Sequence, residues 1–131
     1  MIELDREGDV FVLRMRAGEN RFSLDWLDGF TTALIQVQAT EGPVALVTTG
    51  EGKFYSNGMD LDWLATVPEQ AGDYLIAIYR LLGRVLSFPA ITVAAEKVMD
   101  SPTRVSELIT ASFGSIPRRS ASRTRNTRNS P

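Results

Sequence analysis

Residues 48–61 read Thr48-Thr49-Gly50-Glu51-Gly52-Lys53-Phe54-Tyr55-Ser56-Asn57-Gly58-Met59-Asp60-Leu61, and this stretch decides the fold. It continues the apolar, β-branched run 44–49, which is typical of a buried parallel strand. It then turns through glycines into a short helix that we expect over 59–65. Backbone N–H groups at the start of a helix lack partners within the helix and attract anions. Such a turn can hold a ligand oxygen, although many strand-to-helix turns only redirect the chain.

The sequence before this stretch predicts a hairpin and a helix. Residues 2–4 and 10–16 alternate between apolar and polar side chains around Gly8-Asp9, which is a turn sequence, so they should form a β-hairpin. Ser23 is a good N-cap, and apolar residues at helical spacing follow it to about Ala39.

The sequence after the stretch predicts a second helix and a third parallel strand. Residues 70–86 have a broad apolar face, so we expect a largely buried helix. Residues 90–95 should form another buried strand. Strands that alternate with helices in this order predict βαβ crossovers and an α/β layer architecture.

The composition restricts the possible chemistry. The 131 residues include no cysteine and no histidine, which excludes disulfides, thiolate catalysis and the commonest general base. Apolar residues make up 44% of the chain, as in an ordinary globular protein, and no apolar run is long enough to span a bilayer. The net charge of −2 combines an acidic body with five arginines and no acid in residues 117–131.

The stretch 48–61 resembles the first oxyanion segment of the enoyl-CoA hydratase/isomerase (crotonase) superfamily. The pattern Phe-x-Ser-Asn-Gly-x-Asp-Leu, residues 54–61, is most similar to the Δ3,Δ2-enoyl-CoA isomerase-like branch. Residues 20–24 resemble the loop into the first helix of the family, and residues 84–95 resemble the helix and strand that lead to its second loop. The resemblance covers residues 1–95 and implies an α/β, crotonase-like spiral of ββα units (ClpP/crotonase type).

The resemblance also implies site residues for an acyl-CoA substrate. The backbone N–H of Met59 would be one of two donors to the thioester oxygen in an oxyanion hole. The same loop would contact acyl-CoA through Ser56, Asn57, Gly58 and Asp60. Lys53 and Arg21 are candidates for the CoA phosphates, with solvated surface charge as the alternative. We expect no metal, and no cofactor apart from the coenzyme A of the substrate.

The function that the resemblance implies is double-bond isomerisation in fatty-acid β-oxidation. An enolate stabilised at its oxygen would form while a carboxylate moves a proton, and a 3-enoyl-CoA would become a 2-enoyl-CoA. Hydration by an enoyl-CoA hydratase is the neighbouring alternative. The family implies a peroxisomal or mitochondrial location, and otherwise a cytoplasmic one, since no targeting signal is visible.

The resemblance ends after Ala95. The family continues into a glycine-rich loop with the second donor, whereas this chain has no glycine between Ala95 and Gly114. The catalytic carboxylate and trimer-forming helices of the family also have no match here. We therefore expect a domain truncated on its C-terminal side, a divergent segment 96–114 with one short helix, and a disordered Arg/Ser-rich tail over 115–131.

Two alternatives to an active isomerase follow from this departure. One donor without its partner and base should lose most of the catalysis, which leaves a catalytically impaired form or a non-catalytic acyl-CoA-binding protein. The arginine tail suggests a nucleic-acid arm, but it has no aromatic residue for base stacking and the body is acidic. We therefore expect no nucleic-acid partner and no membrane.

Overall fold

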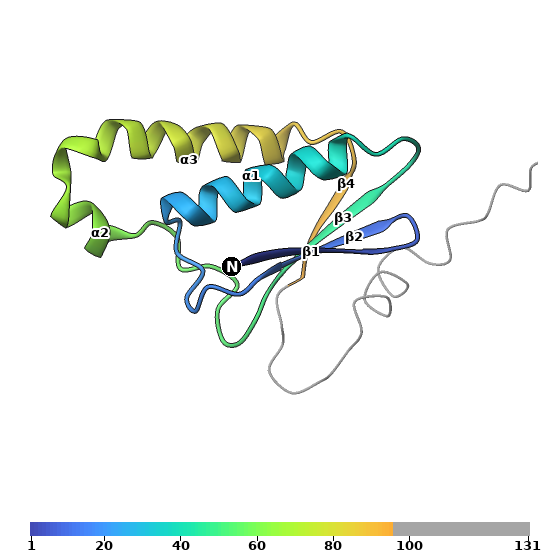
Figure 1. The fold of residues 1–131 in the computed structure, drawn as a ribbon, viewed down its shortest axis with the longest axis horizontal. Coiled ribbons are helices and arrows are strands. Elements are labelled where there is room, and N and C mark those ends of the chain that lie inside the picture. Colours follow the sequence, from blue (N-terminus) through green and yellow to red (C-terminus); the bar gives the residue numbers. More distant parts are fainter. Residues whose placement is uncertain (96–131) are drawn as a thin grey trace, which may run out of the picture.

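The computed structural model describes residues 1–95, so the segments predicted over 96–114 and 115–131 lie outside the described residues. Within 1–95 the strands β1 (Ile2–Glu7), β2 (Val10–Met15), β3 (Ala45–Gly50) and β4 (Ile91–Ala95) form one sheet in the order β1-β2-β3-β4. β1 and β2 are antiparallel, whereas β2, β3 and β4 are parallel. The α/β prediction is confirmed for this part of the chain (Figure 1).

Helices connect the parallel strands on one side of the sheet. α1 (Leu24–Gln38) joins β2 to β3, and α2 (Leu61–Thr66), a 3₁₀ turn (Pro68–Gln70) and α3 (Ala71–Leu86) join β3 to β4. α1 and α3 lie beside each other above the sheet (Figure 1). Because the strands follow one another in sequence order, crossovers of a single hand place both helices on the same face.

The core lies between the sheet and these two helices. Alternate residues of β2 point toward the helices, and α3 contributes residues spaced four and three apart, as expected for one face of a helix. The buried cluster contains Phe11, Leu13 and Met15 of β2, Leu46 of β3, Trp26, Leu27, Phe30, Ala33, Leu34 and Val37 of α1, and Tyr74, Ile78 and Leu81 of α3.

Local sequence signals fix where the helices begin. The Ser23 hydroxyl accepts the Trp26 N–H at 3.2 Å, so the predicted N-cap of α1 is confirmed. α2 begins two residues later than predicted because the Asp60 side chain caps it by accepting the Trp63 N–H at 3.2 Å. Met59 therefore belongs to the loop and not to the helix.

Two burial predictions are wrong. The helix predicted over 70–86 buries Tyr74, Ile78 and Leu81, but Leu82 and Leu86 are 43% and 88% exposed. An apolar helix face is buried only where another element covers it, and within residues 1–95 α3 packs on one side alone. β4 is also mostly exposed, because it is the end strand of the described sheet.

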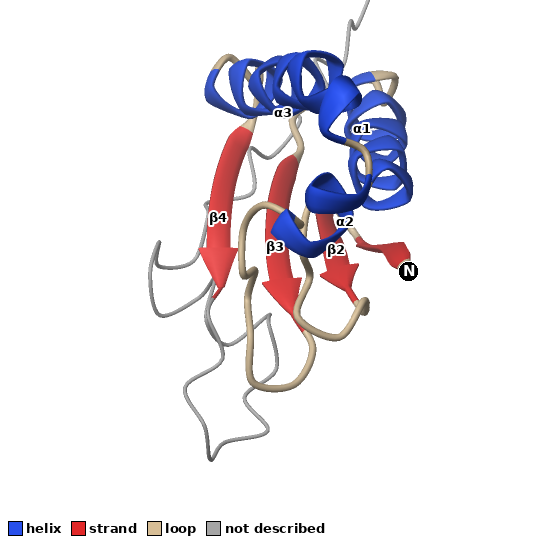
Figure 2. Ribbon diagram, turned by 90° about the vertical axis from the view of Figure 1, so that its left-hand side faces the viewer, coloured by secondary structure: helices blue, strands red, loops and turns tan. Residues whose placement is uncertain are grey.

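The parallel strands end at a common edge. β2, β3 and β4 point the same way, and the loops that follow β2 and β3 leave the sheet together (Figure 2). Ligands of open α/β sheets bind beyond the carboxyl ends of the strands. Residues 16–22 and 51–60, which follow β2 and β3, are therefore where a site is expected.

Packing of α1 against the sheet predicts a contrast between two leucines. Leu34→Ala should lower the free energy of unfolding by about 2–5 kcal/mol, because Leu34 is 1% exposed and its loss leaves a cavity. Leu86→Ala, at a position 88% exposed, should change it by less than about 0.5 kcal/mol. Urea unfolding measures both, and equal losses would contradict the packing described.

Candidate functional site

The loops after β2 and β3 are bound to each other along their backbones. Arg21 and Gly58 form a parallel β-bridge, in which the Phe22 N–H donates to the Gly58 carbonyl at 2.8 Å. One residue earlier in the second loop, the Asn57 N–H donates to the Glu19 carbonyl at 2.9 Å. The loop of residues 51–60 is therefore a fixed part of the structure.

Gly50 permits the tight turn at the end of β3. A Cβ added there would lie 2.8 Å from the Tyr55 Cα and would also overlap the Phe54 carbonyl oxygen. These are backbone atoms that cannot move without shifting the loop. Glycine is needed at position 50 because the loop backbone leaves no room for a Cβ atom.

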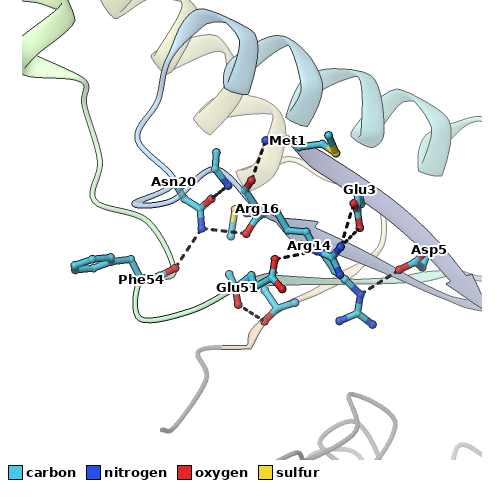
Figure 3. A network of polar contacts seen from close by, with 12 residues as sticks. Met1, Glu3, Asp5, Arg14, Arg16, Asn20, Glu51 and Phe54 are labelled. Carbon is cyan, nitrogen blue, oxygen red and sulfur yellow. Dashed lines mark hydrogen bonds and ion pairs between the residues drawn. The ribbon is translucent and has the colours of Figure 1, made fainter.

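Asn20 holds the two loops together. It is fully buried and has a left-handed backbone with φ 51°. Its side-chain amide donates to the carbonyls of Met15, Phe54 and Tyr55 at 3.1–3.2 Å, and its Oδ1 accepts the Ala17 N–H at 2.9 Å (Figure 3). One side chain thus satisfies four backbone groups from both loops.

Ser56 continues this network. Its hydroxyl donates to the Asn20 carbonyl at 2.7 Å and accepts the Gly58 N–H at 3.2 Å. The Ser56 side chain therefore supports the loop from within. Together with Asn20 it sets the backbone path from Phe54 to Gly58.

The peptide group between Gly58 and Met59 is held on one side only. Its carbonyl accepts the Phe22 N–H, and Gly58 has a φ of 76°, which suits glycine. Because the N–H and C=O of a peptide point in opposite directions, this bond aims the Met59 N–H away from Phe22. Among the described residues, no group accepts a hydrogen bond from the Met59 N–H.

The adjoining amides of the loop all have partners. The N–H groups of Asn57 and Gly58 are bonded as described, the Asp60 N–H donates to the Tyr74 hydroxyl at 2.8 Å, and the Leu61 N–H donates to the Met59 carbonyl at 3.1 Å. Over residues 57–61 the Met59 amide is thus left as a donor for a ligand. The Met59 side chain is 41% exposed.

Arg21 is occupied by carboxylates. Its guanidinium contacts Glu19 at 2.7 Å, Asp62 at 2.5 Å and Asp60 at 3.6 Å. Hydrogen bonds to Asp62 and Glu19 raise the pKa of Arg21 above its ordinary value. In turn, hydrogen bonds from Arg21 and Asn57 lower the pKa of the Glu19 carboxyl. An arginine already paired in this way is a poor candidate for a phosphate.

Two further cations lie near the loop. The Lys53 ammonium lies 5.3 Å from the centre of the Phe54 ring and forms no ion pair with the described residues. Arg16 pairs with Glu3 at 3.0 Å and with Glu51 at 3.1 Å, which ties β1, β2 and the start of the loop together (Figure 3). Of the two residues predicted to bind the CoA phosphates, Lys53 and Arg21, Lys53 is therefore the better candidate.

Residues 1–95 contain no group of three acidic side chains arranged to hold a metal ion. In the same part of the chain, no helix is long and apolar enough to cross a membrane. The carboxylates beside the loop are ion-paired: Glu19, Asp60 and Asp62 with Arg21, and Glu51 with Arg16. The backbone donor that the described site offers to a ligand is the Met59 N–H.

Similar proteins carry this fold and sequence pattern. The chain is 38% identical over 97 residues to enoyl-CoA delta isomerase 2, peroxisomal, of Arabidopsis thaliana, and 35% identical over 102 residues to enoyl-CoA delta isomerase 3 of that plant. Each match covers 72% of this chain. The solved structure of a probable enoyl-CoA hydratase from Mycobacterium tuberculosis matches 71% of the chain with 27% identity and a TM-score of 0.64.

The chain belongs to the enoyl-CoA hydratase/isomerase (crotonase) superfamily. The crotonase fold is also seen in an enoyl-CoA hydratase from Bacillus anthracis, with a TM-score of 0.66 at 23% identity. No family model matches the sequence. The chain spans about two-fifths of the length of the curated relatives, 38% and 42% for the two isomerases.

The site residues predicted from the sequence lie on the two paired loops, residues 16–22 and 51–60. Ser56, Asn57, Gly58, Met59 and Asp60 lie on one loop, as expected. Sequence reasoning missed Asn20 and Tyr74 as the residues that hold this loop. Asn20 had a signal, since asparagine adopts a positive φ more readily than most residues, whereas Tyr74 appeared only as an apolar position of a helix.

Two substitutions of Asn20 should separate its side-chain bonds from its backbone conformation. Asn20→Gly removes the four hydrogen bonds and should cost about 1–3 kcal/mol of unfolding free energy. Asn20→Ala should cost about 1–2 kcal/mol more, because alanine resists the left-handed conformation. Urea unfolding of both variants tests this, and wild-type stability in Asn20→Ala would show that the network is absent.

The lowered pKa of Glu19 predicts a pH-dependent contribution to stability. A carboxyl with a lowered pKa in the folded state stabilises the fold above its unfolded pKa of about 4.3, and the effect is lost as the pH falls through the folded value. Glu19→Gln should therefore be less stable than wild type at pH 7, with the difference vanishing in acid. Urea unfolding across pH tests this, with Glu41→Gln at an exposed position as the control. A pH-independent difference would contradict the Glu19–Arg21 pair.

Proposed function

We propose that this chain binds acyl-CoA thioesters, with the Met59 N–H as a donor to the thioester carbonyl. The observation that carries the proposal is the Met59 amide, the one amide over residues 57–61 with no partner among residues 1–95, in a peptide whose carbonyl is fixed by Phe22. Preorganised backbone donors stabilise negative charge on a carbonyl oxygen because they need no rearrangement when it develops. The names of the Arabidopsis relatives support enoyl-CoA as the substrate class.

We propose isomerisation as the reaction of the family branch to which this chain is related. Donation to the thioester oxygen would stabilise a dienolate, so that a proton could leave carbon 2 of the acyl chain and be returned at carbon 4, which would turn a 3-enoyl-CoA into a 2-enoyl-CoA. Hydration of a 2-enoyl-CoA would form a different enolate, that of the 3-hydroxyacyl-CoA, with its charge on the same thioester oxygen, and the name of the probable hydratase from Mycobacterium tuberculosis supports it as the second candidate.

We propose that this chain binds its substrate better than it converts it. The carboxylates beside the described loop form ion pairs with Arg21 or Arg16, so a carboxylate would have to leave its arginine before it could take a proton from a ligand. The described part supplies one oxyanion donor, and losing one donor of a pair costs about 3–4 kcal/mol of transition-state stabilisation. A non-catalytic acyl-CoA-binding role is therefore the consistent reading of residues 1–95.

We also propose a ligand for the CoA phosphates and a cellular location for the chain. Lys53 is the cation that we assign to the CoA phosphates, because Arg21 is compensated by three carboxylates. We propose a role in fatty-acid β-oxidation in the peroxisome, and the name of enoyl-CoA delta isomerase 2, peroxisomal, of Arabidopsis supports this location.

Removal of the Met59 N–H should abolish the preference for a thioester. The wild-type chain should bind butyryl-CoA roughly two- to tenfold more tightly than S-butyl-CoA, which lacks the carbonyl, since one net hydrogen bond contributes about 0.5–1.5 kcal/mol. Replacing the Met59 amide by an ester should bring the two dissociation constants together. Calorimetric titration measures both.

The matched control is Met59→Leu, which changes the side chain and retains the N–H, so the preference should persist. Assays with a 3-enoyl-CoA should show turnover near background in all variants. Equal affinities for the two ligands in the wild-type chain would sink the proposed contact, and no saturable binding of either would sink the binding function.

A further inference from the structure

We infer that Tyr74 of α3 is a positioning residue for the acyl-CoA carbonyl, acting through Asp60 on the Met59 amide. The inference rests on the proposed function, because it assumes that the Met59 N–H is the donor. It assigns a role to a side chain that lies 15 residues away in the sequence, on a different element.

Tyr74 is buried at the point where α3 meets the loop. It is 1% exposed, and its ring lies 5.3 Å from the Trp63 ring of α2 at an interplanar angle of 56°. A buried tyrosine hydroxyl needs a hydrogen-bond partner, since leaving it without one costs free energy. Among the described residues its partner is a backbone amide of the loop.

The Tyr74 hydroxyl accepts the Asp60 N–H at 2.8 Å. Asp60 is then held from both directions, because its Oδ1 accepts the Trp63 N–H at 3.2 Å and its carbonyl accepts the Leu64 N–H at 3.0 Å. Tyr74 therefore joins α3 to the residue directly after Met59.

Two fixed peptide groups flank Met59 as a result. The peptide before it is held by the bond from Phe22 to the Gly58 carbonyl, and the peptide after it is held by Tyr74 and by the Leu61 N–H at 3.1 Å. Rotation of the Met59 N–H requires at least one of these bonds to break. Without the Tyr74 hydroxyl, the second peptide loses its contact with the core and the Met59 amide is less well aimed.

Tyr79 offers a matched control on the same helix. It is 69% exposed, and its hydroxyl bonds to no group among residues 1–95. Tyr74→Phe and Tyr79→Phe remove the same atom, one from the loop contact and one from the surface. Any effect of tyrosine loss that is unrelated to the loop should appear in both.

The test compares these two variants of the full chain with wild type. The readouts are the ratio of the dissociation constants of S-butyl-CoA and butyryl-CoA, and the infrared C=O stretch of bound [1-¹³C]butyryl-CoA. In Tyr74→Phe the ratio should fall toward one and the stretch should return toward its value in free ligand, while the affinity for S-butyl-CoA is retained. Tyr79→Phe should match wild type in both readouts.

A Tyr74→Phe chain with the wild-type ratio and stretch would overturn the positioning role and leave the proposed function standing. A ratio near one in the wild-type chain would instead overturn the proposed function, and the role of Tyr74 with it. Replacing the Asp60 amide by an ester removes the same bond from the donor side. It should reproduce the Tyr74→Phe result, and a wild-type ratio there would also count against the inference, even if Tyr74→Phe does not fold.

Discussion

The four hydrogen bonds of the Asn20 side chain are the interaction on which the site depends. They join carbonyls from the end of β2 and from the loop after β3, two segments that are more than 30 residues apart in the sequence. Because Asn20 is buried, these bonds form away from competing water, and breaking one leaves an unsatisfied carbonyl. The loop path from Phe54 to Met59 follows from this constraint.

The position of the free amide follows in turn. Asn20 and Ser56 fix the loop, and the bridge between Arg21 and Gly58 then orients the next peptide. As a result, the Met59 N–H points away from Phe22 and has no partner among the described residues. The donor arises from the pairing of two loops at the carboxyl edge of the sheet. The dipole of α2 contributes little, since this helix has six residues and begins after Asp60.

Much of the fold could be predicted because its signals are local. The hairpin, the Ser23 cap and the parallel strand before the loop each follow from a short pattern, and the structure has all three. The burial of α3 and β4 could not be predicted in this way. An apolar face shows that burial is favourable, but it does not show which element supplies the cover. The partners of Arg21 were equally invisible, because ion pairs such as that with Asp62 join residues 41 positions apart. The contact of Tyr74 with the loop could not be predicted for the same reason, because its partner Asp60 lies 14 positions away in the sequence.

The Met59 N–H has no partner among residues 1–95, and we propose that it donates to a thioester carbonyl when acyl-CoA binds. The most direct measurement is the amide spectrum of ¹⁵N-labelled chain. Before ligand is added, Met59 should exchange its amide hydrogen faster than Gly58, Asp60 and Leu61, whose amides are bonded. On titration with butyryl-CoA the Met59 proton resonance should move downfield and its exchange should slow, with no such change for S-butyl-CoA. A Met59 amide that is already protected without ligand, or that does not respond while butyryl-CoA saturates the chain, would contradict the account.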